Sequence, residues 1–177
     1  MNVSRTVVED NLFEHCNGEI EIVSNKSCEN VYRNNTFLEC AGALTLRHGN
    51  RCEVYGNVFI GNSQKNTGGV RIIGEDHRVF SNRFFDLAGE DARAAICLMN
   101  GIVNSPLNGY YQVKRAWITS NTISRCKQDF VIGFSDEKAT LPPVECVITN
   151  NIIVASRDNV KAPSGLVEGV GPAWRGR

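Results

Sequence analysis

The chain has 177 residues, enough for one domain with a buried core, and 42% of them are hydrophobic, as in a folded globular protein. Nineteen basic and nineteen acidic residues cancel, so the overall charge favours neither nucleic acid nor an anionic membrane surface as a partner. No stretch approaches the roughly 20 apolar residues of a transmembrane helix, and Met1–Asp10 lacks the pattern of a signal peptide. A polyanion would therefore need a local basic patch.

A repeated pattern runs through the chain: an apolar residue, two variable positions, an Asn, one further residue and a second apolar residue. Its six copies centre on Asn11, Asn35, Asn57, Asn82, Asn121 and Asn151. Their separations of 24, 22, 25, 39 and 30 residues are typical of a β-solenoid with short strands and loops of variable length. We expect an all-β solenoid of about six coils over residues 1–160.

The repeated Asn residues are predicted to be architectural. Asn tolerates the left-handed backbone region, so we expect it at the bend of each coil, where stacked Asn side chains can form hydrogen bonds along the solenoid.

Seven cysteines, an odd number, argue against a complete set of disulfides. Cys16 and Cys40 are 24 residues apart, as are Cys28 and Cys52. Equal spacing predicts equivalent positions on successive coils, with the thiols buried as small hydrophobic groups. A zinc site is not expected, because no CxxC pair is present.

A second strand aligns in four coils, over residues 18–23, 42–47, 69–73 and 95–99. If its apolar residues face inward, alternation places in one outward column Glu21, Thr45, Arg71 and Cys97. Glu19 would lie in the neighbouring column. Stacked strands are about 4.8 Å apart, so Glu19, Glu21, Arg47 and Arg71 are expected within about 10 Å of one another along the stack.

Two segments depart from the repeat. Residues 100–114 are rich in Asn and Gly and enlarge one coil, which predicts a loop that forms the wall of a groove beside the same strands. Residues 161–177 show no repeat and are expected to form an irregular or disordered tail.

The outward patch has a chemistry of its own. Glu19 and Glu21, two residues apart on a strand, point to the same side and can chelate Ca²⁺, although a solvating pair is the simpler alternative. Lys26 follows the strand, and Arg47 ends the next one. A cation, a Lys and an Arg together suit β-elimination from a uronic acid, because the cation offsets the charge that builds beside the substrate carboxylate while a neutral amine removes the proton. A glycosidase with two carboxylates is a further alternative.

Four segments carry a resemblance to a known family: GEIEIVSNKS, YRNNTF, LTLRHGN and NGIVNSPLN, which begin at residues 18, 32, 44 and 100. They resemble the polysaccharide lyase family that contains chondroitinase B and many alginate lyases. The resemblance implies a right-handed parallel β-helix and Ca²⁺-assisted elimination, with Lys26 as the base and Arg47 as its acid partner. It also implies that Glu19 and Glu21 bind calcium.

The resemblance implies further features. His48 and Arg93 match positions near the substrate, while Arg71 is a candidate substrate-binding residue from the column alignment alone. An acidic polysaccharide is the expected partner, with alginate favoured over chondroitin or dermatan sulfate, and a secreted or periplasmic location is expected. The family has a third calcium ligand, an Asn, one coil earlier, which would precede Met1. The chain is thus expected to be an N-terminally truncated part of a larger lyase domain, and a non-catalytic carbohydrate-binding or structural role is the alternative.

Overall fold

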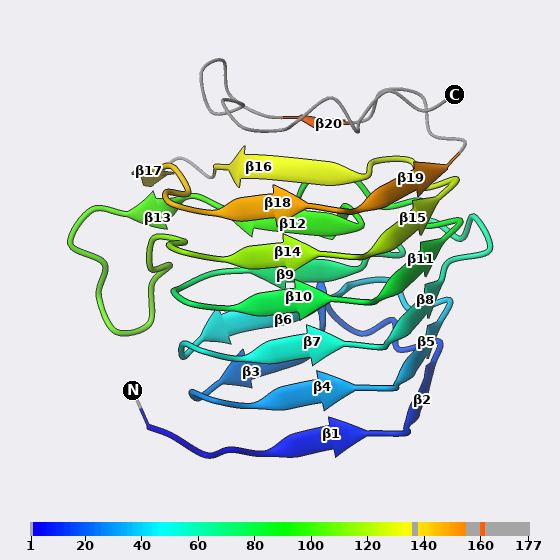
Figure 1. The fold of residues 1–177 in the computed structure, drawn as a ribbon, viewed down its shortest axis with the longest axis horizontal. Helices are drawn as coiled ribbons and strands as arrows, with labels where there is room; N and C mark the ends of the chain where they lie inside the picture. Colours follow the sequence, from blue (N-terminus) through cyan, green and yellow to red (C-terminus); the bar gives the residue numbers. More distant parts are fainter. Residues whose placement is uncertain (1, 136–137, 155–159, 162–177) are drawn as a thin grey trace.

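The computed structural model describes residues 2–135, 138–154 and 160–161, which form a right-handed parallel β-helix (Figure 1). Each coil contributes one strand to each of three six-stranded parallel sheets. The predicted all-β solenoid and its number of coils are confirmed. No helix in the described ranges is long and apolar enough to cross a membrane.

Most strands have only three residues, because bends divide each coil among three sheets. The first sheet contains β1 (Val7–Glu9), β4 (Val31–Arg33), β7 (Glu53–Tyr55), β10 (Arg78–Phe80), β14 (Trp117–Thr119) and β18 (Val147–Thr149). The second contains β2 (Leu12–Glu14), β5 (Thr36–Leu38), β8 (Val58–Ile60), β11 (Arg83–Phe85), β15 (Thr122–Ser124) and β19 (Ile152–Val154). The third contains β3 (Glu21–Lys26), β6 (Ala43–His48), β9 (Val70–Ile72), β12 (Ile96–Met99), β16 (Phe130–Phe134) and β20 (Val160–Lys161).

The repeated Asn residues form a ladder at the turn between the first and second sheets. In the first five coils, the Asn side-chain Nδ2 donates to the Oδ1 of the Asn in the next coil at 2.9–3.0 Å, and the Asn backbone N–H donates to the same oxygen at 3.0–3.1 Å. The predicted ladder is confirmed. The predicted backbone is wrong: the left-handed residue is the one before each Asn, with φ between 54° and 65°. That residue makes the bend, which leaves the Asn N–H aligned along the stack.

The core is a column of aromatic rings that continues as aliphatic side chains. Phe13, Phe37, Phe59 and Phe84 stack with ring centroids 4.5–4.8 Å apart. Ile123 continues this column in register with Phe84. Each stacked pair contributes about 0.5–1.5 kcal/mol beyond its buried area.

All seven cysteines are free thiols, and five are buried. Because Leu12 pairs with Thr36, Cys16 falls opposite Cys40 as predicted. The predicted equivalence of Cys28 and Cys52 is wrong, because Val31 pairs with Glu53, only 22 residues on. Asn50, in place of Cys52, donates its backbone N–H to the Cys28 sulfur at 3.3 Å.

The third sheet differs from the predicted alignment in its first strand. Thr45, Arg71 and Cys97 pair in one column as predicted, but Ser24 takes the first position and Glu21 lies opposite Ala43. The prediction assumed an offset of 24 residues between the two strands, whereas Ser24 pairs with Thr45 at an offset of 21 and Glu21 pairs with Ala43 at an offset of 22. The β3 strand also has two register shifts, at Glu21/Val23 and Asn25/Lys26. Such bulges change the direction in which side chains point.

The enlarged coil forms the expected loop between β13 (Gly101–Ile102) and β14, which protrudes from the solenoid (Figure 1). The base of the loop is held by antiparallel pairing of β13 with β17 (Ala139–Leu141). A short 3-10 helix, η1 (Asp91–Arg93), precedes β12. Of the predicted tail, Lys161 belongs to β20, and residues 162–177 lie outside the described residues.

Candidate active site

A cleft of about 530 Å³ opens on the outer side of the third sheet. Its walls come from the segment leading into β3, from β3, β6, β9, β12, β16 and η1, and from the loop that follows β13. The lining residues are Glu19, Ile20, Glu21, Ser24, Lys26, Arg47, Arg71, Ala92, Met99, Tyr110 and Phe134. The predicted proximity of Glu19, Glu21, Arg47 and Arg71 is therefore confirmed. Three cationic and two carboxylate side chains give the cleft a small positive excess, which suits an anionic ligand.

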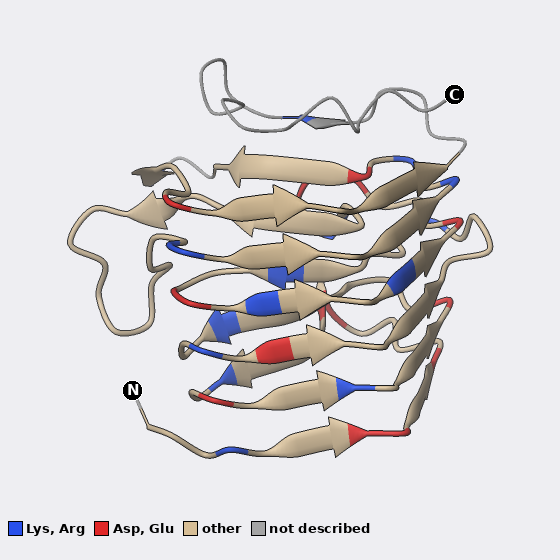
Figure 2. Ribbon diagram, in the orientation of Figure 1, with Lys and Arg blue, Asp and Glu red and all other residues tan. Residues whose placement is uncertain are grey.

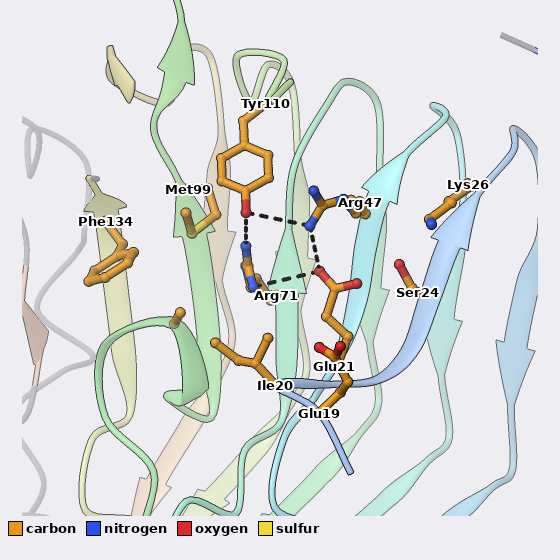
Figure 3. A pocket seen from close by; sticks show the side chains of 11 residues that line it. Glu19, Ile20, Glu21, Ser24, Lys26, Arg47, Arg71, Met99, Tyr110 and Phe134 are labelled. Atoms are coloured by element: carbon orange, nitrogen blue, oxygen red, sulfur yellow. Dashed lines mark hydrogen bonds and ion pairs between the residues drawn. The ribbon is translucent and has the colours of Figure 1, made fainter. Parts of the chain in front are cut away.

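Glu21 lies at the centre of a charged network in this cleft (Figure 3). Arg47 donates from Nη1 to Glu21 Oε1 at 3.1 Å, and the Arg71 Nη1 lies 3.7 Å from the same oxygen. The side chains of Glu21 and Arg71 are only 10% and 4% exposed, so water screens their attraction weakly. Alternation along the strands placed Glu21 and Arg71 in one column. The structure places them in different columns, but both side chains line the cleft.

Tyr110 completes the network from the opposite side. Its hydroxyl accepts hydrogen bonds from Arg71 Nη2 at 2.8 Å and from Arg47 Nη1 at 3.5 Å. Both guanidinium carbons also lie over its ring, 5.1 Å and 5.3 Å from the centroid. The sequence predicted that this loop forms a wall of the cleft, but it did not identify Tyr110. The two adjacent tyrosines in an Asn- and Gly-rich loop were the available signal.

Arg47 remains cationic in this setting. Burial disfavours its charge, but the bonds to Glu21 and Tyr110 outweigh that effect and hold the pKa of Arg47 above its ordinary value. Its side chain is 29% exposed, so part of the guanidinium remains accessible to a ligand.

Lys26 lies on the neighbouring strand, with its amine turned toward the cleft (Figure 3). Across residues 2–135, 138–154 and 160–161, no carboxylate forms an ion pair with it. The β3 bulge at Asn25/Lys26 places it opposite His48. The amine is therefore available to a ligand.

Two of the predicted substrate-binding residues do not line the cleft. His48 pairs with Lys26 across the strands, and burial together with the charges of Arg47 and Lys26 lowers the pKa of the imidazole, which is neutral near pH 7. Its Nδ1 is buried without a hydrogen-bond partner in the described part of the chain. Arg93 ends η1, where its backbone packs against Gly68 and Gly89 while the preceding Ala92 faces the cleft.

The oxygen ligands available to a cation are the carboxylates of Glu19 and Glu21. Carboxylate oxygens are what Ca²⁺ prefers, and both groups face the same space, so they fit as part of a calcium shell. No cluster of three or more His, Cys, Asp or Glu side chains that could hold a metal occurs among the residues that the structure covers. Calcium takes six to eight oxygens, so these two carboxylates would form only part of its shell.

The fold and the site thus define a class of protein: a parallel β-helix with a cationic cleft over one of its sheets. The family model of chondroitinase B matches residues 1–164. The chain belongs to this family of polysaccharide lyases. No curated protein sequence matches it.

Solved structures with the same fold include family 6 polysaccharide lyases. The chain is 32% identical to the PL6 family alginate lyase AlyGC, with a TM-score of 0.81 over 90% of this chain and 26% of that one. It is 31% identical to a mannuronic acid specific family 6 lyase from human gut microbiota, with a TM-score of 0.74 over 90% of this chain and 38% of the other. A PL6 alginate lyase in complex with a trisaccharide is 25% identical, with a TM-score of 0.80 over 91% and 39% of the two chains. The chain therefore spans less than half the length of these relatives.

Proposed function

We propose that the chain carries the catalytic face of a lyase that cleaves a uronic acid polymer, alginate before chondroitin or dermatan sulfate, by β-elimination. The observation that carries the proposal is the convergence of Lys26, Arg47, Glu19 and Glu21 on one cleft. The structural relatives described as alginate lyases support alginate as the polymer. A polysaccharide substrate is encountered outside the cytoplasm, so a secreted or periplasmic location is part of the proposal.

Lys26 is the proposed base. After it loses its proton, the Lys26 amine would take the proton from C5 of the uronate, and the electron pair of the C5–H bond would form the C4–C5 double bond while the C4–O4 bond breaks. Because Lys26 has no carboxylate partner among the described residues, no ion pair has to be broken first.

Arg47 is the proposed acid partner. Its raised pKa means that it holds its proton firmly, but a departing alkoxide is basic enough to take that proton, and solvent can restore it. Before that step the guanidinium stabilises negative charge that develops on the substrate.

Glu19 and Glu21 are proposed to hold Ca²⁺, which would offset the charge on the substrate carboxylate as C5 loses its proton. Glu21 also holds Arg47 in position, so the same carboxylate would bind the calcium ion and orient the proposed acid.

The test is the ultraviolet absorbance of the unsaturated uronate product when purified protein meets polymannuronate, polyguluronate or dermatan sulfate with calcium. Lys26→Ala and Arg47→Ala are expected to abolish the signal with the circular dichroism spectrum retained. Matched controls are Lys65→Ala and Arg83→Ala, which remove exposed cations outside the cleft. Equal rates for Lys26→Ala and the parent protein would refute Lys26 as the base.

A second candidate function is a carbohydrate-binding or structural β-helix without catalysis. The observation in its favour is that, in the described part of the chain, only Glu19 and Glu21 bring carboxylates to the cleft and that Glu21 is already held by two arginines. Calorimetry separates the two functions: oligosaccharide binding that forms no product and does not depend on calcium would support this one.

A further inference from the structure

A second cleft, of about 480 Å³, lies on the first sheet and shares no lining residue with the first cleft. Its lining residues are Arg51, Glu53, Asp76, Arg78, Arg115 and Trp117. Glu53, Arg78 and Trp117 come from β7, β10 and β14, where they pair in register as one outward column. The other three come from the turns that lead into these strands.

The turn residues are held in a ladder of ion pairs. Arg51 bonds to Glu29 in the previous coil at 2.9 Å, and Arg115 makes a two-pronged contact with Asp76 at 2.7 Å and 2.9 Å. Figure 2 shows this alternation of basic and acidic segments along one edge of the first sheet. These arginines are therefore already paired with carboxylates.

Arg78 is different. Its Nη1 lies 3.7 Å from Glu53 Oε1, beyond hydrogen-bond distance, and within the described residues its side chain makes no hydrogen bond. The side chain is 58% exposed, with its guanidinium carbon 5.7 Å from the ring centroid of Trp117. Trp117 itself is 42% exposed, an unusual exposure for so large an apolar side chain. A guanidinium without hydrogen bonds among the described residues thus lies over one face of a partly exposed indole.

We propose that this second cleft is a non-catalytic binding site for the uronic acid polymer, in which Arg78 pairs with a sugar carboxylate and Trp117 stacks against a sugar ring. The identity of the polymer rests on the proposed function; the existence of the site does not. A planar guanidinium pairs with a carboxylate through two parallel hydrogen bonds, and an indole offers an apolar face to the C–H side of a pyranose. Neighbouring strands are about 4.8 Å apart, close to the length of one pyranose unit, so a polymer lying across them would meet Arg78 and Trp117 with adjacent sugars.

Glu53 gives the proposal a distinctive consequence. Its carboxylate is the only acidic group near Arg78 in the column, so a bound uronate competes with it for the guanidinium. Removing that charge should strengthen binding, whereas a merely structural ion pair would give no such gain.

The test is electrophoresis of the folded protein through native gels that contain alginate, in a Lys26→Ala background that prevents cleavage, with calorimetry on a trimannuronate. Trp117→Ala and Arg78→Gln are each expected to weaken binding about three- to tenfold, and Glu53→Gln to strengthen it. Tyr55→Ala is the matched control, since it removes an aromatic ring from the same sheet outside the cleft. Thermal unfolding establishes that each variant is folded.

Three outcomes would overturn the proposal: unchanged alginate retardation in both Trp117→Ala and Arg78→Gln, no gain with Glu53→Gln, or equal retardation by neutral dextran. Retardation does not depend on turnover, so an inactive chain that still binds through Arg78 and Trp117 would refute the lyase and retain the site. Conversely, product formation with no effect of these variants would retain the lyase and refute the site.

Discussion

The Arg47 guanidinium donates a hydrogen bond from Nη1 to Glu21 Oε1 over 3.1 Å, which joins the proposed acid to a proposed calcium ligand. The two residues come from adjacent strands of the third sheet, β3 and β6, in which Glu21 pairs with Ala43. Changing Glu21 should therefore alter metal binding and the position of Arg47 together.

Glu21→Gln is expected to weaken calcium binding by about tenfold or more, because a carboxylate is lost from a site with few of them. It should also lower the free energy of unfolding by about 1–3 kcal/mol, since Arg47 and Arg71 lose their common anion in a partly buried cleft. Calorimetry with calcium chloride and thermal unfolding measure the two effects. Glu53→Gln, on the other face, is the control; unchanged calcium affinity in Glu21→Gln would exclude Glu21 as a ligand.

Tyr110→Phe removes the acceptor shared by Arg71 and Arg47 but keeps the ring beneath both guanidinium groups. We expect kcat to fall about tenfold with KM little changed, because Arg47 loses its orientation while the cleft keeps its charge. Stability should fall by about 1 kcal/mol. Tyr111→Phe, one residue further along the loop, is the comparison. An unchanged kcat would mean that Glu21 alone positions Arg47.

His77 makes stability depend on pH. It is fully buried, its Nδ1 accepts the Cys52 N–H at 3.2 Å, and its Nε2 therefore donates to the Ile73 carbonyl at 3.0 Å. Burial lowers the pKa of His77 from 6.5 to about 4. The unfolded chain takes up a proton below pH 6.5 and the folded chain does not, so stability is complete above that pH and falls as the pH drops toward 4, by about 3 kcal/mol.

Urea unfolding at pH 7.5, 6, 5 and 4 checks this dependence, and His77→Gln should flatten it. His15→Gln, which changes an exposed imidazole, is the comparison variant. Equal stability of the parent protein at pH 7.5 and 4.5 would contradict the assignment.

The Asn ladder should contribute unequally along its length. Asn57 is fully buried; it donates to Tyr32 O and Asn82 Oδ1, and its Oδ1 accepts from Asn35. Asn57→Ala leaves several buried groups without partners and is expected to cost about 3 kcal/mol. Asn151→Ala, near solvent, should cost about 1 kcal/mol. Chemical denaturation measures both losses of stability. Similar losses for the two variants would mean that burial does not determine how much each Asn of the ladder contributes to stability.

The sequence by itself determined the solenoid, its Asn ladder and the convergence of Glu19, Glu21, Arg47 and Arg71. These features depend on a local pattern repeated from coil to coil, in which inward apolar residues and turn residues recur at nearly constant spacing. Even Arg71, placed by alternation alone, lies in the cleft.

Only the tertiary structure decided which residues face one another. The offset of 21 to 22 residues between β3 and β6 placed Glu21 outside the predicted column. A coil of 22 residues likewise placed Asn50, in place of Cys52, opposite Cys28, and the loop after β13 brought Tyr110 against two arginines. Glu53, Arg78 and Trp117 each lie four residues before a repeated Asn, so the repeat itself aligns them, but only the stacked coils show that they line a cleft. Register between coils is set by hydrogen bonds across the stack, and residue spacing along the chain does not record where a coil gains or loses a residue.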